Sequence, residues 1–326
     1  STQAKTLFPY TTLFRSAVPA RAAEPLFSSP SDVMSTAPVS LNGLSPEQKA
    51  EFTRLTQAPA YAWPTIRLWV VVVGVYLSSY VLAGIGTIPL WVGMVVNSAI
   101  GYFAFSIVHD SIHRAISTNA RLNDFIGQTT VWLGAPYVDL KLFRWGHILH
   151  HRFTGGPRDP DNVLHGPVWS LPFRWLVIDL LYLIHSIRFG DKVSKPYLRR
   201  SLWLTAGTAV VFGALIANGY FWHLLMLWLV PSRMIFLTLG FSFFWLPHVP
   251  HDVRQDENLT RATAVRLGHE GFLTPALQYQ NFHLIHHLYP TTPFYNNVRV
   301  WQLLEPALRQ RDRKSTRLNS SHANVS

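Results

Sequence analysis

Residues 68–108, LWVVVVGVYLSSYVLAGIGTIPLWVGMVVNSAIGYFAFSIV, decide the fold class, because they contain no charged residue and no histidine. A helix that crosses a bilayer needs about 20 apolar residues, so this run is long enough for two crossings. Gly86 and Pro89 interrupt the run and predict a tight turn at that point. We therefore expect two membrane spans joined in a hairpin, near 67–85 and 89–108.

A second apolar stretch has the same layout. Residues 201–247 carry a single charge, Arg233, and a turn is expected at Gly219. They predict spans near 201–218 and 223–247. A soluble protein would need two helical hairpins that are apolar on every face, whereas soluble helices keep a polar face. The predicted fold class is therefore an all-α integral membrane protein, with four transmembrane helices in two hairpins under a helical cap.

The distribution of positive charge predicts how the chain lies in the membrane. The turns around 85–88 and 217–221 carry no Lys or Arg, so the positive-inside rule places both termini and the segment 109–200 in the cytoplasm. The expected location is the bacterial inner membrane. This topology accounts for the formal net charge of +11 and removes the support for nucleic-acid binding. The absence of cysteine excludes disulfides, iron–sulfur clusters and thiolate-ligated haem.

The segment between the two hairpins is too long to lack structure. Residues 119–135 predict a partly embedded helix. Residues 170–187 are apolar but contain Arg174, Asp179 and His185, which favours a helix lying in the membrane interface over a fifth span.

The two ends of the chain have a different character. TLFPYTTLFRS at 6–16 and DRKSTRLNSSH at 312–322 resemble translated sequencing adapters. We interpret 1–16 and 312–326 as adapter-like artefacts of sequence assembly. The domain organisation that follows has a flexible N-terminal arm at 17–60, which is rich in Ala, Pro and Ser, and a membrane catalytic domain at 61–311.

Eight of the 15 histidines fall in three short boxes on the predicted cytoplasmic side. The boxes are HDSIH, HILHH and HLIHH, and they contain His109, His113, His147, His150, His151, His283, His286 and His287. On a helix, positions i, i+3 and i+4 share one face, so each box directs its imidazoles toward one point. Eight histidines exceed the needs of one ion, which predicts two metals. A donor set of nitrogen without thiolate favours redox-active iron over structural zinc.

Other polar residues beside the boxes are candidates for supporting roles. HVPHD at 248–252 provides His248 and His251, where a ninth ligand could enter. A ligating histidine usually donates its second N–H to a carboxylate or carbonyl. The candidate partners for these histidines are Asp110, Asp159, Asp161, His251, Asp252 and Asn281. His165, His185, His223 and His269 stand alone and are expected to have structural roles.

The motifs resemble those of the membrane fatty acid desaturase and hydroxylase superfamily. They are HDSIHR at 109–114, GHILHHRFTGGPRDPDN at 146–162, FFWLPHVPH at 243–251 and NFHLIHHLYPTTPFYNN at 281–297. Their sequence is similar both to bacterial acyl desaturases and to desaturase-type carotenoid hydroxylases. The resemblance implies that the eight box histidines bind two non-haem irons. It also implies a further ligand at the end of span four, for which His248 is preferred and His251 is second.

The activity that the resemblance implies is O₂-dependent desaturation of a fatty acyl chain, or hydroxylation of a carotenoid ring or alkyl chain. No catalytic residue is expected beyond the metal ligands. The implied partners are a lipid or carotenoid substrate from the bilayer and an external electron donor, a ferredoxin or cytochrome, suited to the basic cytoplasmic face. A membrane electron carrier with bis-histidine haem is a distant alternative, because its histidines would stand singly inside spans. A metal transporter would need polar residues along its spans, and only Arg233 qualifies.

Overall fold

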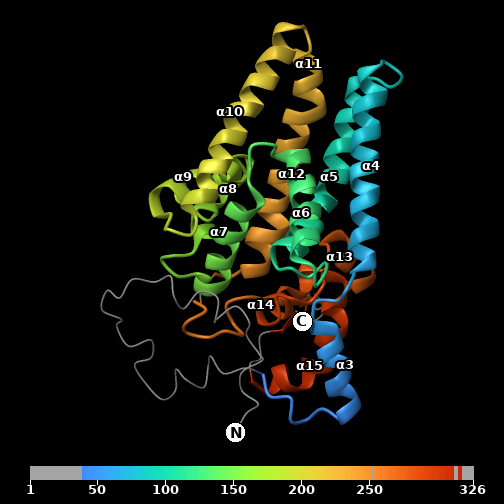
Figure 1. The fold of residues 1–326 in the computed structure, drawn as a ribbon. Helices are drawn as coiled ribbons and strands as arrows, with labels where there is room; N and C mark the ends of the chain where they lie inside the picture. Colours follow the sequence, from blue (N-terminus) through green and yellow to red (C-terminus); the bar gives the residue numbers. More distant parts are fainter. Residues whose placement is uncertain (1–38, 252, 312–314, 318–326) are drawn as a thin grey trace, which may run out of the picture.

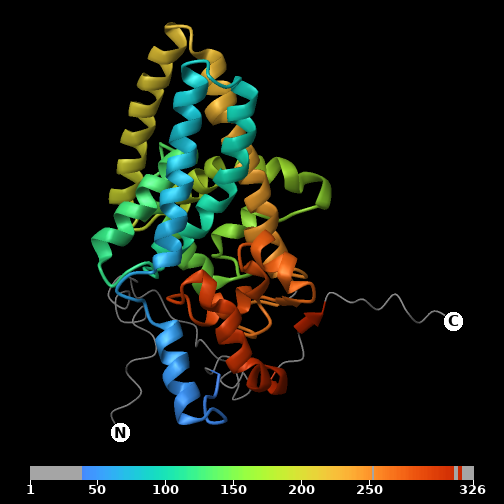
Figure 2. The same ribbon diagram turned by 90° about the vertical axis from the view of Figure 1, so that its right-hand side faces the viewer.

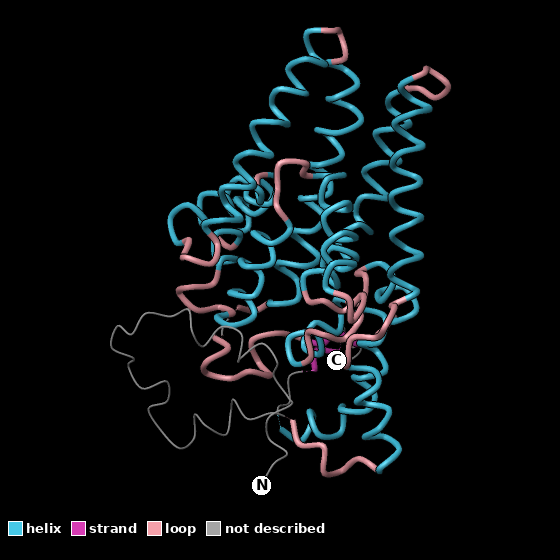
Figure 3. Tube along the Cα trace, in the orientation of Figure 1, coloured by secondary structure: helices cyan, strands magenta, loops and turns pink. Residues whose placement is uncertain are grey.

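The computed structural model describes residues 39–251, 253–311 and 315–317, and these residues are predominantly helical (Figure 1, Figure 3). The expected artefact at 1–16 lies outside the described residues. Of the C-terminal one at 312–326, only β2 (Ser315–Arg317) is described, and its backbone pairs in parallel with β1 (Val265–Leu267). The interpretation of both ends as artefacts stays a prediction.

Four segments are long and apolar enough to cross a membrane, as the sequence predicts. They are α4 (Trp63–Gly84), α5 (Leu90–Ile112), α10 (Lys195–Ala217) and the continuous run Phe221–His248. The best 18-residue window of each has a mean hydropathy between 1.4 and 1.8. Each helix differs from its predicted bounds by a few residues, because helical geometry continues past the point where charges begin. The two hairpin turns lie at the same end of the molecule (Figure 1).

The fourth span is built from several helical segments. It consists of α11 (Phe221–Leu224), a π-helical turn η3 (Leu225–Leu229), α12 (Val230–Leu239), a second π-helical turn η4 (Gly240–Trp245) and a final 3₁₀ turn η5 (Leu246–His248). It packs along α5, where Asn97 Nδ2 donates to the carbonyl of Leu227 at 2.9 Å. This contact places the two hairpins side by side.

Large apolar side chains on the outer faces of the spans are exposed, as they would be in contact with lipid. Val70, Trp91 and Val210 are each more than half exposed. In α10, only 6% of the most apolar window is buried inside the protein. An exposed apolar helix is stable in a bilayer because its backbone groups are paired within the helix.

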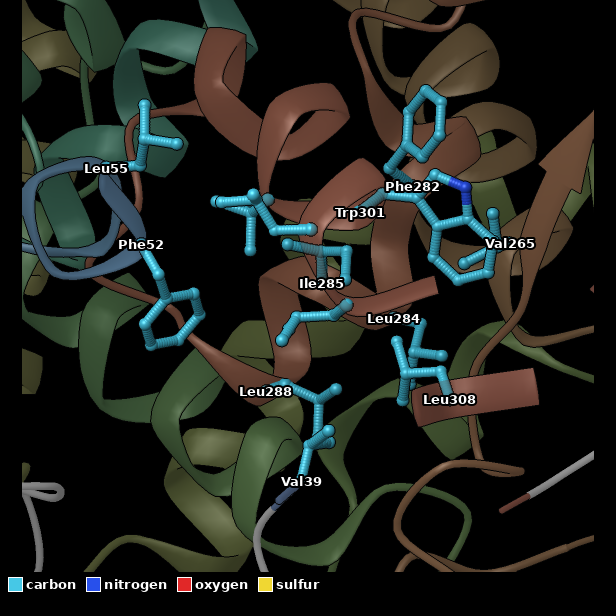
Figure 4. Close-up of a cluster of buried hydrophobic side chains, with 13 residues drawn as sticks. Val39, Phe52, Leu55, Val265, Phe282, Leu284, Ile285, Leu288, Trp301 and Leu308 are labelled. Carbon is cyan, nitrogen blue, oxygen red and sulfur yellow. The ribbon is translucent and has the colours of Figure 1, made fainter. Parts of the chain in front are cut away.

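The cap forms at the end opposite to the hairpin turns (Figure 2). It contains α3 (Pro46–Thr56), α13 (Glu270–Ala276), the 3₁₀ turn η6 (Gln280–Phe282), α14 (His283–Leu288), the 3₁₀ turn η7 (Phe294–Asn296) and α15 (Asn297–Arg311). Its core is a cluster of buried side chains, among them Phe52, Leu55, Ile285, Leu288 and Trp301 (Figure 4). Ile285 and Leu288 belong to α14, so this packing holds in place the helix that carries the third histidine box.

Part of the predicted flexible arm is ordered, which corrects the expectation for 17–60. Residues 46–56 form α3, which begins with a capping box between Ser45 and Gln48. Phe52 and Leu55 are buried against the cap, and Glu51 pairs with Arg299 at 2.8 Å. The low apolar content of the arm conceals this helix, because two large side chains are enough to attach it to the cap.

The segment between the hairpins contains α6 (Ala120–Gly134), which matches the helix predicted at 119–135, and α7 (Leu140–Phe153). The single interfacial helix predicted at 170–187 is wrong. The chain forms η2 (Val168–Ser170) with α8 (Leu171–Leu176), and then α9 (Ile178–Phe189), with a bend of 82° between them.

The bend between α8 and α9 has a local cause on each side. Trp175 of α8 packs directly on Gly240, where an added Cβ would lie 2.2 Å from the indole Cγ. Asp179 of α9 turns to Arg233 on α12, with an N–O distance of 2.9 Å. Val177 between them leaves helical geometry, with φ −121° and ψ 29°. These tertiary contacts override the apolar pattern that predicted one straight helix.

Candidate metal centre

The first histidine box lies at the end of α5. His109 is in its last turn and His113 is its C-terminal cap. Arg144 of α7 holds this end, because its guanidinium donates to the carbonyls of Ile112 at 3.0 Å and Ser111 at 3.1 Å. A cation at a helix C-terminus also interacts favourably with the helix dipole. Arg144 therefore fixes α7, and with it the second box, against the first.

The second box lies on α7, which begins at the Asp139 cap. Its i, i+3, i+4 spacing places His147 and His151 about 40° apart around the helix, and His150 about 60° from His147 and about 100° from His151. The third box forms α14, where His286 and His287 follow His283 with the same spacing. Both helices therefore present imidazoles in two directions.

The structure brings nine histidines together in two groups. In each group the candidate ligand atoms all lie within 4.8 Å of one another. One group is formed by His109, His113, His147, His151 and His286, and the other by His150, His248, His283 and His287. Each box thus contributes to a shared centre, and the second and third boxes contribute to both groups.

The distances between imidazole nitrogens fit a metal-ligand set. Nε2 of His151 lies 3.0 Å from Nε2 of His147 and 2.9 Å from Nε2 of His286. Nε2 of His287 lies 3.0 Å from Nε2 of His283. Two nitrogens bound to one ion at about 2.1 Å, at right angles, are separated by about 3.0 Å. A single hydrogen atom cannot form hydrogen bonds among the Nε2 atoms of His147, His151 and His286 together, whereas one metal ion can bind all three.

The buried nitrogens of the site also fit a metal. Nε2 of His109 and of His248 are buried and make no hydrogen bond within the described part of the chain. Such buried polar atoms are rare unless they bind an ion or a water. Burial lowers the pKa of the histidines outside the spans, namely His113, His147, His151, His283, His286 and His287. It therefore keeps these rings neutral, which is the form that binds metal.

In the four-histidine group, three Nδ1 atoms face an oxygen that would accept their hydrogen. His150 faces Asp159 at 2.9 Å, His283 faces the side-chain oxygen of Gln280 at 2.5 Å, and His248 faces the carbonyl of Ala262 at 3.4 Å. A histidine that donates from Nδ1 presents Nε2 to a metal. These contacts orient the Nε2 atoms of His150, His283 and His248 for metal binding.

His150 has the strongest partners, because two buried carboxylates face its Nδ1. The Asp161 carboxylate lies 3.1 Å from it, in addition to Asp159 at 2.9 Å. Burial alone would lower the pKa of His150, but Asp161 and Asp159 together raise it to about 9. Gly155 donates its backbone N–H to Asp159 at 2.8 Å, with the positive φ of 73° that glycine tolerates.

Two further sequence candidates, Asp110 and Asn281, hydrogen-bond to residues outside the two groups. Asp110 accepts from the Thr65 hydroxyl and the Phe294 N–H, and Asn281 donates to Thr274. The ring of His251 stacks near that of His165, with centroids 4.2 Å apart, and lies outside both groups. Asp252 lies outside the described residues. Of the two candidates for a ninth ligand, only His248 joins a group.

Two residues of the site are absent from the sequence candidates. The Tyr182 hydroxyl of α9 donates to Asp161, and Gln280 accepts from His283. Gln280 lies three residues before its histidine, and the habit of ligating histidines to find an oxygen acceptor could have indicated it. Tyr182 is remote in sequence from the boxes, and only the bend before α9 brings it to Asp161.

An apolar cavity of about 340 Å³ lies beside the five-histidine group, between α5, α6, α7, α9 and α12. Phe105, Phe143, Tyr182 and Phe244 are among the residues that line it. The ring centroid of Phe105 lies 5.8 Å from that of His109, and the centroid of Phe143 lies 6.1 Å from that of His147. Phe105 and Phe143 therefore line the cavity and also lie against the histidines.

Comparison with known proteins agrees with this arrangement. Residues 85–317 match the sequence profile of the family described as fatty acid desaturase. A beta-carotene ketolase of Paracoccus sp. is 28% identical over 198 residues, which cover 60% of this chain and 72% of the relative. A zeaxanthin 4-ketolase of Chlamydomonas reinhardtii is 27% identical over 209 residues, covering 62% and 42%. An sn-1 linoleoyl-lipid 6-desaturase of Synechocystis sp. is 25% identical over 190 residues, covering 48% and 51%.

Proposed function

Since the chain belongs to the fatty acid desaturase family of membrane oxidoreductases, we propose that it uses two irons and O₂ to oxidise an unactivated C–H bond of an apolar lipid. The observation that carries this proposal is the pair of buried histidine groups, one of which lies beside an apolar cavity that α5 and α12 help to line. The primary reaction is desaturation of a fatty acyl chain.

The residues that would hold the irons are the nine histidines of the two groups. One iron would take up to five nitrogen ligands and the other up to four. These donor sets leave coordination positions open and contain no thiolate, which suits non-haem iron better than a closed structural zinc site. When bound, the irons supply the redox chemistry that couples reduction of O₂ to oxidation of a C–H bond.

The protein's own contribution is to hold the histidines, position the substrate and exclude water. Phe105 and Phe143 give the inner end of the cavity an apolar wall next to the five-histidine group. A substrate chain bound in the cavity would present the same carbon to the metal centre in each turnover. Correct placement of reacting atoms accounts for much of enzymatic rate acceleration. Asp159 and Asp161 hold His150 in its ligating orientation.

A second candidate reaction is oxygenation of a carotenoid ring or an alkyl chain. The similarity to beta-carotene ketolases, over more than two thirds of one relative's length, favours this candidate. An oxygenase and a desaturase begin with the same hydrogen removal. They differ in whether a second hydrogen leaves, which gives a double bond, or an oxygen is added, which gives an alcohol and on further oxidation a ketone.

The proposal includes an orientation and an electron source. The hairpin turns carry no Lys or Arg, which supports a cytoplasmic cap and metal centre. An external ferredoxin or cytochrome would deliver electrons to this side, and its acidic surface would suit the basic face of the cap.

The test is expression in a host supplied with candidate acyl lipids and carotenoids, followed by mass spectrometry of the products. We expect a product that has lost two hydrogens, or one that has gained oxygen, and two irons per purified chain. His150→Ala should abolish turnover, whereas His223→Ala, on the far side of the membrane, is the matched control and should keep it. Purified protein that holds two zinc ions and gains no activity with iron would refute the proposal.

A further inference from the structure

A polar cluster of three residues interrupts the apolar interior between the spans. Arg233 of α12 donates to the Asp179 carboxylate at 3.0 and 2.9 Å and to the Tyr137 hydroxyl at 3.2 Å. The Tyr137 hydroxyl in turn donates to Asp179. The guanidinium also donates to the carbonyl of Leu176 at 2.9 Å. Ionic groups are costly within a membrane, and where they occur they usually serve a function.

The cluster lies at the end of the cavity that is remote from the histidines. Tyr137 and Asp179 both line the cavity, and most of the other residues around it are apolar. Along the fourth span, Ile235 and then Phe244 line the same cavity. Phe244 lies eleven positions after Arg233, which corresponds to about 16 Å of helix. The cavity is therefore apolar along its length, polar at one end and adjacent to the metal centre at the other.

The hydrogen bonds within the cluster leave capacity for a ligand. Nε of Arg233 is buried and has no acceptor among the described residues. The Tyr137 hydroxyl donates one hydrogen bond and accepts one, so a second lone pair remains available. An ion pair that served only to join α9 to α12 would not need a tyrosine hydroxyl on the cavity wall.

We propose that this cluster binds a hydroxyl group of the substrate, which can donate to the free lone pair of the Tyr137 oxygen, and so determines which carbon reaches the metal centre. The inference rests on the proposed function, since it concerns the same cavity. Asp179 already neutralises Arg233, so the cluster has no net charge with which to attract a carboxylate. The preferred substrate is an apolar chain that carries an alcohol group about 16 Å along the cavity from the reacting end.

The test uses purified full-length protein in detergent and two photoreactive forms of 1-hexadecanol. One carries a diazirine next to the hydroxyl, and the other carries it near the methyl end. After irradiation, peptide mass spectrometry identifies the labelled residues. We expect the hydroxyl-end probe to label the segments around Tyr137 and Asp179. The methyl-end probe should label those around Phe105 and Phe143.

Tyr137→Phe keeps the Asp179–Arg233 pair and removes only the hydroxyl. It should reduce the ratio of correctly oriented to reversed labelling about tenfold, which is the effect expected of one buried hydrogen bond. Tyr220→Phe is the matched control, because Tyr220 lies in the distant hairpin turn, and its labelling ratio should equal that of the wild type.

The outcomes separate this inference from the proposed function. Equal labelling of both ends of the cavity by the hydroxyl-end probe, or a ratio unchanged by Tyr137→Phe, would overturn the role of the cluster. Iron content and product formation, measured on the same preparations, report on the proposed function independently. If the labelling is oriented as expected while the protein lacks iron and turnover, the binding inference stands and the proposed reaction fails.

Discussion

Replacing the carboxylates beside His150 should weaken iron binding without unfolding the protein. Asp159→Asn and Asp161→Asn have nearly the same size and shape as the native residues. Each variant keeps one side-chain oxygen, so the bond from the Gly155 N–H and the one from Tyr182 can both survive, while an amide nitrogen replaces the oxygen that faces Nδ1 of His150. The change therefore removes a negative charge and a hydrogen-bond acceptor beside Nδ1 of His150, and in Asp159→Asn also the acceptor of the Asp161 N–H.

The size of the effect follows from the electrostatics of the pair. The two carboxylates raise the pKa of His150 from 6.5 to about 9 despite burial, which corresponds to about 3 kcal/mol in favour of a positively charged ring. A metal-bound imidazole carries part of that charge. We therefore expect each single variant to lose iron affinity by about 10- to 100-fold, the usual effect of removing such a partner. The double variant should lose more than either single one.

The assay is iron content per chain after equilibration with a graded series of a competing chelator. Asp256→Asn, which removes an exposed carboxylate outside the site, is the matched control and should bind iron like the wild type. Thermal unfolding in detergent shows whether the variants are folded. A double variant that is folded and binds both irons with wild-type affinity would refute the assigned role of these carboxylates.

Three further predictions concern the site and the fold. His248→Ala should lose about half of the bound iron, whereas His251→Ala should keep it, and equal iron contents would contradict the grouping of the histidines. In metal-free protein, the histidines with lowered pKa values should make thermal stability fall as the pH drops below about 6.5, because the unfolded chain then binds more protons than the folded one. His150, with its raised pKa, acts oppositely and loses its contribution as the pH rises toward 9; a flat profile from pH 8 to 5 would contradict both assignments. Gly240→Ala should destabilise the protein by about 1–3 kcal/mol, because the new Cβ would overlap Trp175, and an unchanged melting temperature would show that the indole moves freely.

The spans could be predicted from the sequence because a membrane imposes a simple rule. A charge-free apolar run of about 20 residues has few possible structures other than a membrane-spanning helix, and only 14% of the residues in this chain are charged. The bend between α8 and α9 could not be predicted, because it depends on Trp175 meeting Gly240 and on Asp179 meeting Arg233. The same limit applies to α3, whose attachment depends on a cap formed by residues more than 200 positions away.

The eight box histidines could be identified because helical spacing makes their convergence visible in the sequence. The assignment of each histidine to one of the two groups could not be predicted, because it depends on how α7 and α14 are rotated about their axes. The distinction between His248 and His251 depends on where the fourth span ends, and Val249 already has an extended conformation after η5. Tyr182 could not be identified from the sequence, because its partner Asp161 lies on another element.

The division of the histidines has a consequence for how metal would be acquired. His147 and His151 of α7 face one group while His150 faces the other, and α14 divides in the same way between His286 and the pair His283 and His287. An ion in either group would restrict the motion of both helices. The entropic cost of ordering the second site would then be partly met when the first ion binds, and the second ion would bind more tightly. Loading should therefore be cooperative. With limiting iron, chains would be mostly empty or doubly loaded, and a chain with a single ion, able to react with O₂ without the paired centre, would remain scarce.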